Sequence, residues 1–227
     1  MPIDYTKRPS NPQPPAPSQP GVSLSKVTLT KQAPKVSLTK QGSVGGVMRV
    51  NLNWNARPAT ASRGLFKRPE PAIDLDLGCL YEFTDGSKGV VQALGRAFSA
   101  SPRGVAEPVI RLDGDDRSGS NAEGENLFIN LAYAHQIRRV LVFALIYEGA
   151  ANWAAADGVV TLYPASGPQI EVRLDEPRDG ARICGIALLE QAGDDLSVRR
   201  EVNYINGSQS RLDAAYGWGM NWAPGRK

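Results

Sequence analysis

Carboxylate side chains are concentrated between positions 113 and 126, where small residues separate Asp113, Asp115, Asp116, Glu123 and Glu125. Ca²⁺ takes roughly six to eight oxygen ligands, so a loop of this composition could wrap around such an ion. The spacing is not that of an EF-hand, and no flanking helices are expected. The alternative interpretation is a solvated turn, because Asp, Gly, Ser and Asn are also common turn residues.

Two further carboxylates, Asp74 and Asp76, lie near the start of a predicted strand. Side chains two residues apart on a strand point to the same face. If this strand end meets the acidic loop, the carboxylates of both segments converge. Glycosidases also use paired carboxylates, but two neighbours on one exposed face favour metal ligation over a pair with separated pKa values.

Other chemistry has little support in the sequence. His135 is the one histidine, and no Gly-x-Ser-x-Gly elbow accompanies it. Cys79 and Cys184 lie far apart in apolar runs, which predicts buried thiols and not a zinc site. We see no phosphate-binding glycine loop and no RNA-binding aromatic pattern. We therefore expect a protein that is not an enzyme and does not bind nucleic acid directly.

Trp218 and Trp222 stand close together near the end of the chain. Paired aromatic rings of this kind could form a platform for a carbohydrate or a peptide. The other interpretation is that they cap the hydrophobic core, since large aromatic side chains are most often buried against it.

The elements that would position these residues are mainly strands. Met48, Val50 and Leu52 alternate with polar residues, and a long alternating run from Ile73 to Phe83 ends at a predicted Asp85-Gly86 turn. Only two short segments look helical, at 152–157 and 132–136. We therefore predict an all-β fold, a β-sandwich of two sheets with short helical segments. Further strands are expected at 109–112, 127–131, 139–147, 159–163, 170–174, 181–190 and 197–204.

The first part of the chain differs in composition. Residues 1–22 are rich in proline and predict a disordered arm. Residues 23–46 contain a repeat, in which Lys26–Gln32 returns nine positions later as Lys35–Gln41 with strand-like alternation. We expect one copy to lie on a sheet edge and the other to be free to recruit a partner. The sandwich domain is expected over 47–227.

Charge is distributed unevenly along the chain. Residues 1–70 hold eleven Lys or Arg and two acidic residues, whereas the remainder holds fifteen and twenty-one. A basic arm can contact an acidic protein face or an anionic surface, or serve only as a solvated tail. No apolar run is long enough to cross a bilayer, and the start lacks the apolar segment of a secretory signal. We therefore expect a cytoplasmic protein.

In their order, four segments resemble the landmarks of the TerD-type tellurium-resistance and stress protein family, in a divergent, TerA-like form. The segments are Leu52–Asn55, Ile73–Leu77, Gly114–Gly119 and the Glu123–Glu125 lead into Leu127–Leu131. The resemblance continues through Ile137–Tyr147 and ends near Trp222. It departs from the family pattern at Asn55, where aspartate is usual, and in a shorter acidic run.

The resemblance implies a two-sheet β-sandwich that binds Ca²⁺ and acts as a non-enzymatic interaction module in a bacterial stress response. Its partners would be other proteins of the same system and, through them, a membrane-associated complex. The alternative is a metal-free scaffold or a lectin-like subunit of a larger assembly. Carried over by position, the family's calcium ligands become Asp74, Asp76, Asp115, Asp116, Glu123 and Glu125, with Asn121 and Ser118 as neutral candidates.

Overall fold

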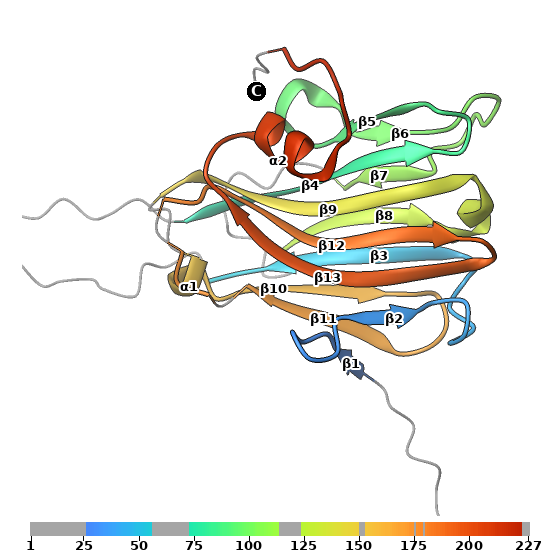
Figure 1. Ribbon diagram of the computed structural model, residues 1–227, viewed down its shortest axis with the longest axis horizontal. Coiled ribbons are helices and arrows are strands. Elements are labelled where there is room, and N and C mark those ends of the chain that lie inside the picture. The colour runs from blue at the N-terminus through green and yellow to red at the C-terminus, as the bar shows by residue number, and fades with distance from the viewer. Residues whose placement is uncertain are drawn as a thin grey trace, which may run out of the picture.

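The computed structural model describes residues 26–55, 73–113, 124–149, 153–174, 176–178 and 180–223. Its strands form two sheets that lie face to face (Figure 1). Sheet A has seven strands in the order β1-β11-β10-β3-β8-β7-β6, and sheet B has six in the order β2-β13-β12-β9-β4-β5. The strands of sheet A are β1 (Lys26–Thr28), β3 (Val47–Asn53), β6 (Ser99–Ala100), β7 (Ile110–Leu112), β8 (Glu125–Asn130), β10 (Gly158–Tyr163) and β11 (Gln169–Leu174). Those of sheet B are β2 (Lys35–Ser37), β4 (Asp74–Phe83), β5 (Lys88–Val91), β9 (Ile137–Glu148), β12 (Ile183–Ala192) and β13 (Asp195–Ile205).

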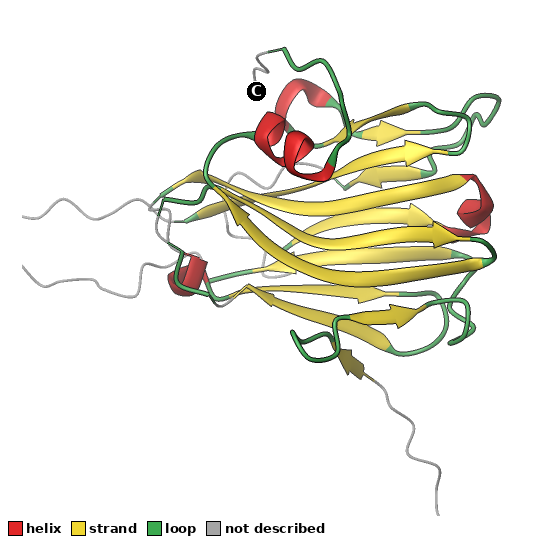
Figure 2. Cartoon of the chain, viewed as in Figure 1, coloured by secondary structure: helices red, strands yellow, loops and turns green. Residues whose placement is uncertain are grey.

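Helices are few and short (Figure 2). The expected segments at 152–157 and 132–136 contain α1 (Trp153–Ala156) and the 3₁₀ helix η2 (Leu131–Gln136), and a second 3₁₀ turn, η1, spans Leu94–Arg96. The longest helix, α2 (Gln209–Tyr216), was not predicted. The fold class is therefore confirmed as a mainly β two-sheet sandwich with a few short helices.

The main hydrophobic core lies between the two sheets, as the alternation predicts. Met48, Val50 and Leu52 of β3 are fully buried, and they belong to the same cluster as Leu75 and Leu77 of β4. Because successive side chains of a strand point to opposite faces, each strand contributes every second residue to this layer.

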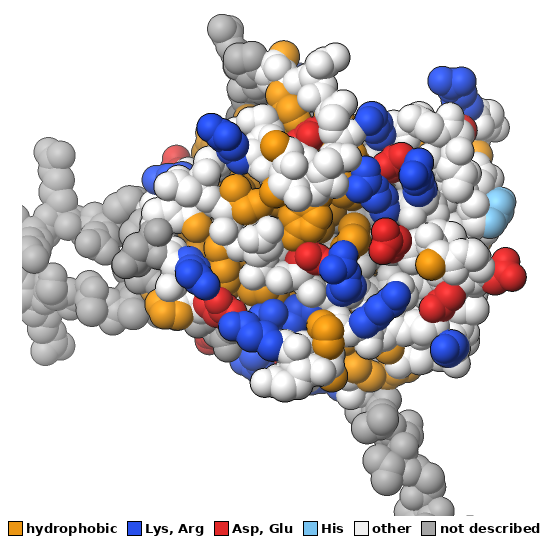
Figure 3. Space-filling view, viewed as in Figure 1, with side chains coloured by type: hydrophobic (Ala, Val, Ile, Leu, Met, Phe, Trp, Pro, Cys, Tyr) orange, Lys and Arg blue, Asp and Glu red, His pale blue; other side chains and the backbone are white. Residues whose placement is uncertain are grey.

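A second hydrophobic cluster covers the outer face of sheet B. Leu80, Phe143 and Leu188 contribute from the strands, and Leu212 and Trp218 contribute from α2 and the segment after it. Figure 1 shows α2 lying over this side of the sandwich. In the space-filling view from the same side, hydrophobic side chains show near the middle of the face with charged side chains around them (Figure 3). The central strands β4, β9 and β12 of sheet B are therefore buried on both faces over most of their length, which explains why β12 is largely apolar.

The two copies of the repeat occupy equivalent places in the two sheets. β1, from the first copy, pairs in parallel with β11 at the edge of sheet A, and β2, from the second, pairs antiparallel with β13 at the edge of sheet B. Each copy buries its leucine, Leu29 or Leu38, in the main core. The expectation that one copy lies on a sheet edge is confirmed. The expectation that the other is free to recruit a partner is wrong, because its apolar side chains are used to complete the core. The proline-rich arm lies outside the described residues.

Candidate functional site

Three of the predicted calcium ligands, Asp74, Asp76 and Glu125, lie in the first residues of β4 and β8. β5 pairs with β4 only from Cys79 to Glu82, so β9 alone among the described strands borders the first half of β4. On the other side of that half, the Leu77 backbone N–H donates to Glu125 Oε2 at 2.5 Å. A carboxylate at the first position of β8 thus connects sheet A to sheet B, next to Asp76.

These carboxylates are more buried than the sequence indicated. Asp76 is 5% exposed and Glu125 is 4% exposed, whereas Asp74 is half-buried. The expectation of an exposed acidic pair is therefore wrong for Asp76. The physical reason is that β4 is buried on both faces along most of its length. Burying a carboxylate is costly unless hydrogen bonds, a cation or a metal compensate for the lost water.

The remaining predicted ligands belong to the acidic loop. Asp115, Asp116, Asn121 and Glu123, together with Ser118, lie outside the described residues. The described residues on either side of this segment are Asp113, whose N–H donates to the Asn126 carbonyl oxygen at 2.9 Å, and Gly124, which precedes Glu125. Both of its ends are therefore attached to the corner that holds the described carboxylates.

A glycine is required at position 124, where the chain enters β8. Its φ is +70°, and a Cβ atom built on it would lie 2.1 Å from the Leu52 carbonyl oxygen. Any other residue would push β8 away from β3 at the point where Glu125 and Leu52 are paired. The glycine in the Glu-Gly-Glu sequence thus lets Glu125 begin the strand.

The side chains of the described candidate ligands carry the type of oxygen donor that calcium binds. Asp74, Asp76 and Glu125 offer carboxylate oxygens, the hard ligands that Ca²⁺ prefers. Within the described ranges, no three His, Cys, Asp or Glu side chains lie close enough to hold a metal ion by themselves. A complete calcium site would therefore also need ligands from the acidic loop.

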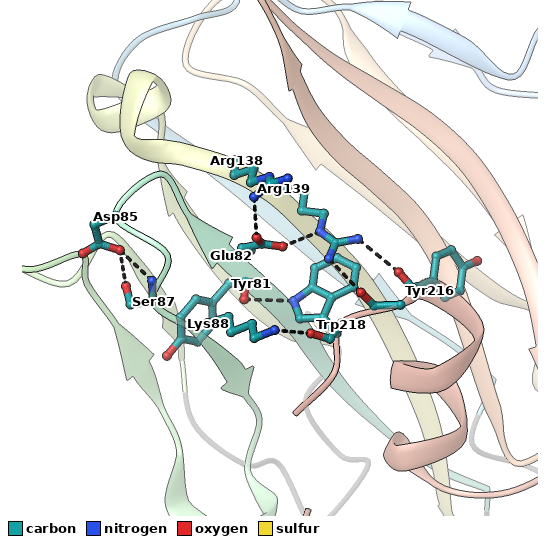
Figure 4. Close-up of polar contacts among 10 residues, drawn as sticks. Tyr81, Glu82, Asp85, Ser87, Lys88, Arg138, Arg139, Tyr216 and Trp218 are labelled. Atoms are coloured by element: carbon teal, nitrogen blue, oxygen red, sulfur yellow. Dashed lines mark hydrogen bonds and ion pairs between the residues drawn. The ribbon is translucent and has the colours of Figure 1, made fainter. Parts of the chain in front are cut away.

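A second polar site, which the sequence did not reveal, fastens the C-terminal segment to sheet B (Figure 4). Arg139 Nε donates to Glu82 Oε2 at 2.7 Å, and its Nη1 and Nη2 atoms donate to the carbonyl oxygens of Tyr216 and Gly217 at 3.0 and 3.2 Å. The same guanidinium lies 3.8 Å from the centre of the Trp218 ring. A positive charge at the C-terminus of α2 complements the helix dipole.

The turn after α2 is organised by Asp213. Its carboxylate accepts hydrogen bonds from Gly219 N, Met220 N and Trp222 Nε1 at 2.8 to 2.9 Å. We call residues 209–223 the C-terminal latch. Ser208 before the helix and Gly217 after it, in the left-handed conformation, are the boundary signals that could have predicted α2.

The surroundings of the tryptophans distinguish a binding platform from a cap on the hydrophobic core. Trp218 is 1% exposed, and its Nε1 donates to the Tyr81 carbonyl oxygen at 3.0 Å. Trp222 is half-buried against Asp213 and borders a pocket of about 400 Å³ beside β5. Capping of a hydrophobic cluster is therefore confirmed for Trp218, which has no exposed ring face to serve as a platform.

The cysteines and the histidine have ordinary surroundings. Cys79 and Cys184 are buried free thiols, as expected, and burial raises the pKa of Cys79 to about 12. His135 is exposed near the end of η2, and its ring Nε2 lies 3.4 Å from Gln136 Nε2.

The fold and the sequence each resemble a known protein. Among solved structures, the chain resembles the crystal structure of a homologue of telluride resistance protein (TerD) from Streptomyces coelicolor A3(2). The TM-score is 0.52 at 20% identity, with 74% of this chain and 95% of that chain covered. At this identity the likeness establishes the fold, a two-sheet sandwich of the TerD type.

The sequence gives the more specific match. The chain is 43% identical over 208 residues to "Tellurium resistance protein TerA" from Alcaligenes sp., which covers 91% of this chain and 60% of that protein. It therefore spans less than two thirds of this relative's length. No family model matches the chain. The expected resemblance to tellurium-resistance proteins is confirmed by the sequence match. Over the described residues, no helix has the length and apolar character needed to cross a membrane.

Proposed function

We propose that this chain is a calcium-binding, non-enzymatic interaction module of a bacterial tellurium-resistance and stress-response system. The similarity to the Alcaligenes TerA protein supports the tellurium-resistance role. The contact between Glu125 and Leu77 N–H supports the calcium site, because it brings a carboxylate of β8 beside Asp76 of β4. The proposed compartment is the cytoplasm, and the proposed partners are proteins of the same system.

Asp74, Asp76 and Glu125 would supply the ligands on the sheets, and Asp115, Asp116, Asn121 and Glu123 those on the loop. Bound calcium would supply the positive charge that offsets this concentration of carboxylates. The two strands hold Asp76 and Glu125 in place without the ion, since both lie within regular sheet structure. Binding would tie the loop carboxylates to those of the strands, and a docking surface would form beside β8.

Melting temperature tests the proposal. A ligand that binds only the folded state raises stability by RT ln(1 + [L]/Kd). With calcium at about 100 times its Kd, the wild-type melting temperature should exceed that in chelator by roughly 5–10 °C. Glu125→Gln, which keeps the size and removes the charge, should lose most of this difference.

Glu190→Gln is the matched control, because Glu190 is exposed and pairs with Arg139 near the start of β9, whereas Asp74 pairs with Glu148 at its end. It should keep the full calcium response. A wild-type melting temperature that is the same in calcium and in chelator would contradict the calcium role and favour a metal-free scaffold.

A further inference from the structure

The outer face of sheet A carries two rows of side chains that run across the strands. In the first row, Tyr163 of β10 is opposite Arg49 of β3, Arg49 is opposite Phe128 of β8, and Phe128 is opposite Arg111 of β7. Aromatic and cationic side chains thus alternate across four neighbouring strands. We call these four residues the arginine–aromatic ladder.

Each guanidinium of the ladder rests on a ring. The Arg49 Cζ atom lies 4.1 Å from the centre of the Tyr163 ring, and the Arg111 Cζ atom lies 4.0 Å from that of Phe128. Stacking restricts the arginine side chains before any ligand arrives, which lowers the entropy lost on binding. It also covers one face of each ring, so the ladder presents N–H donors where bare aromatic surface would otherwise lie.

The second row forms the floor beside the ladder. Asn126 Oδ1 accepts hydrogen bonds from Arg49 Nη1 at 3.1 Å and from Asn51 Nδ2 at 3.0 Å. These two bonds occupy the Asn126 amide oxygen and leave its Nδ2 group as the donor. Asn51 is 7% exposed and Asn126 is 9% exposed, which means that this floor is built into the sheet.

The two rows enclose a shallow pocket of about 560 Å³, lined by Arg49, Asn51, Asp113, Asn126, Phe128 and Tyr163. Arg49 forms no ion pair with any carboxylate of the described residues. Asp113 is the acidic group of the pocket, and Arg111 lies 3.8 Å from it. Among the described residues of the pocket and the ladder, Arg49, Arg111 and Asp113 sum to a charge of +1, and Arg49 and Asn126 both line the pocket.

We propose that this face of sheet A is a docking surface for an acidic segment of a partner protein, with a partner carboxylate bound by Arg49 and Asn126. This deepens the interaction-module function proposed above and rests on it. The net positive charge of these described residues and the N–H groups of Arg49 and Asn126 in the pocket lining favour a carboxylate, and arginine and tyrosine are among the residues enriched at interface hot spots. A sugar ligand is disfavoured because the stacked guanidinium groups cover ring faces on which it would lie.

The location of the surface agrees with this assignment. On sheet B, α2 and the second hydrophobic cluster cover the outer face. On sheet A, Arg111 is exposed and Arg49, Phe128 and Tyr163 are half-buried at the outer face. Glu125 and Asn126 are neighbours in β8, one bonded toward sheet B and the other toward the ladder. The proposed calcium ligands and the docking surface therefore share a strand.

Amide chemical shifts of the ¹⁵N-labelled full chain test the proposal, with a blocked peptide of alternating Asp and Gly as the probe. Shift changes should concentrate in 47–53, 126–130 and 158–163, and affinity should fall as salt rises. Arg49→Gln should weaken binding at least threefold, and Arg49→Lys should lie between it and wild type, because lysine keeps the charge but loses the planar fork. Arg103→Gln, which changes an exposed arginine elsewhere, should bind like wild type.

Three results would overturn the docking surface. The first is a peptide with Asn in place of Asp that binds as tightly as the Asp peptide. The second is an Arg49→Gln variant with the wild-type affinity for the peptide. The third is inorganic phosphate causing the same shift changes as the peptide, which would indicate a small-anion site. Each titration is run in calcium and in chelator. If the peptide binds both in calcium and in chelator, the docking surface is supported, even when calcium does not change the melting temperature. If calcium raises the melting temperature but the peptide does not bind, the docking surface is contradicted and the calcium site is not.

Discussion

Asp85 shows how one side chain organises a turn. In the turn between β4 and β5, its Oδ1 accepts from Ser87 N at 2.8 Å and from Ser87 Oγ, and its Oδ2 accepts from Arg103 N at 2.7 Å. Gly86 takes the positive φ of 81° that the turn needs. The hydrogen bond from the Ser87 hydroxyl, followed by that from Arg103 N–H, lowers the pKa of Asp85 to about 2.

This pKa predicts a pH-dependent effect of Asp85→Asn. The folded value is below the unfolded value of about 4, so the ionised carboxylate stabilises the protein above pH ~4, and this contribution is lost as pH falls toward 2. Asp85→Asn should therefore lower the urea midpoint at pH 7, and the gap from wild type should close between pH ~4 and ~2.

Asp194→Asn is the control, because the Asp194 side chain is exposed and forms no hydrogen bond among the described residues. Its urea midpoint should follow wild type across the range. A gap for Asp85→Asn that stays constant from pH 7 to 2 would refute the role assigned to the charge.

At the scale of residues, the sequence predicts what depends on neighbours along the chain. The Asp85-Gly86 turn follows from local spacing alone. The Arg139 contacts with Glu82 and Tyr216 do not, because residues far apart in sequence form them. The burial of Asp76 was missed for the same reason, since it depends on what packs over β4.

At the scale of elements, the two repeat copies close one side of the sandwich. Leu29 is 3% exposed and Leu38 is fully buried. Leu29→Ala and Leu38→Ala should each destabilise the protein by about 2–5 kcal/mol, the usual cost of truncating a core leucine. Equilibrium unfolding in urea measures both.

Val44→Ala lies in the same stretch and provides the comparison, because Val44 is 39% exposed. It should change stability by less than about 0.5 kcal/mol. If Leu38→Ala is as mild as Val44→Ala, the second copy does not complete the core as described here.

The sequence predicted best those strands and helices whose apolar and polar residues alternate most regularly. β3 and β4 alternate regularly, and the structure contains both. α2 was missed because one apolar residue, Leu212, is buried along it, so its helical pattern is weak. The pairing of β1 with one sheet and β2 with the other could not be read from two identical patterns, since each fits either edge.

At the scale of the molecule, β8 links the two proposed activities. Glu125 at its start contacts β4, and the next residue belongs to the outer face of sheet A. An ion bound at the start of β8 would therefore act on the strand that carries part of the docking surface. The sequence indicated the proposed calcium ligands through its acidic residues and a family resemblance, whereas the ladder depends on the register of four strands and could be found only in the structure.

Calorimetric titration of calcium into the chelator-stripped full chain tests the central claim most directly. Wild type should bind one ion per chain with a measurable heat. Asp76→Asn on the strand and Asp115→Ala on the loop should each abolish that heat, because the site needs ligands from both segments. The absence of heat with wild type, or unchanged binding in both variants, would contradict the proposal that calcium joins the acidic loop to the two sheets.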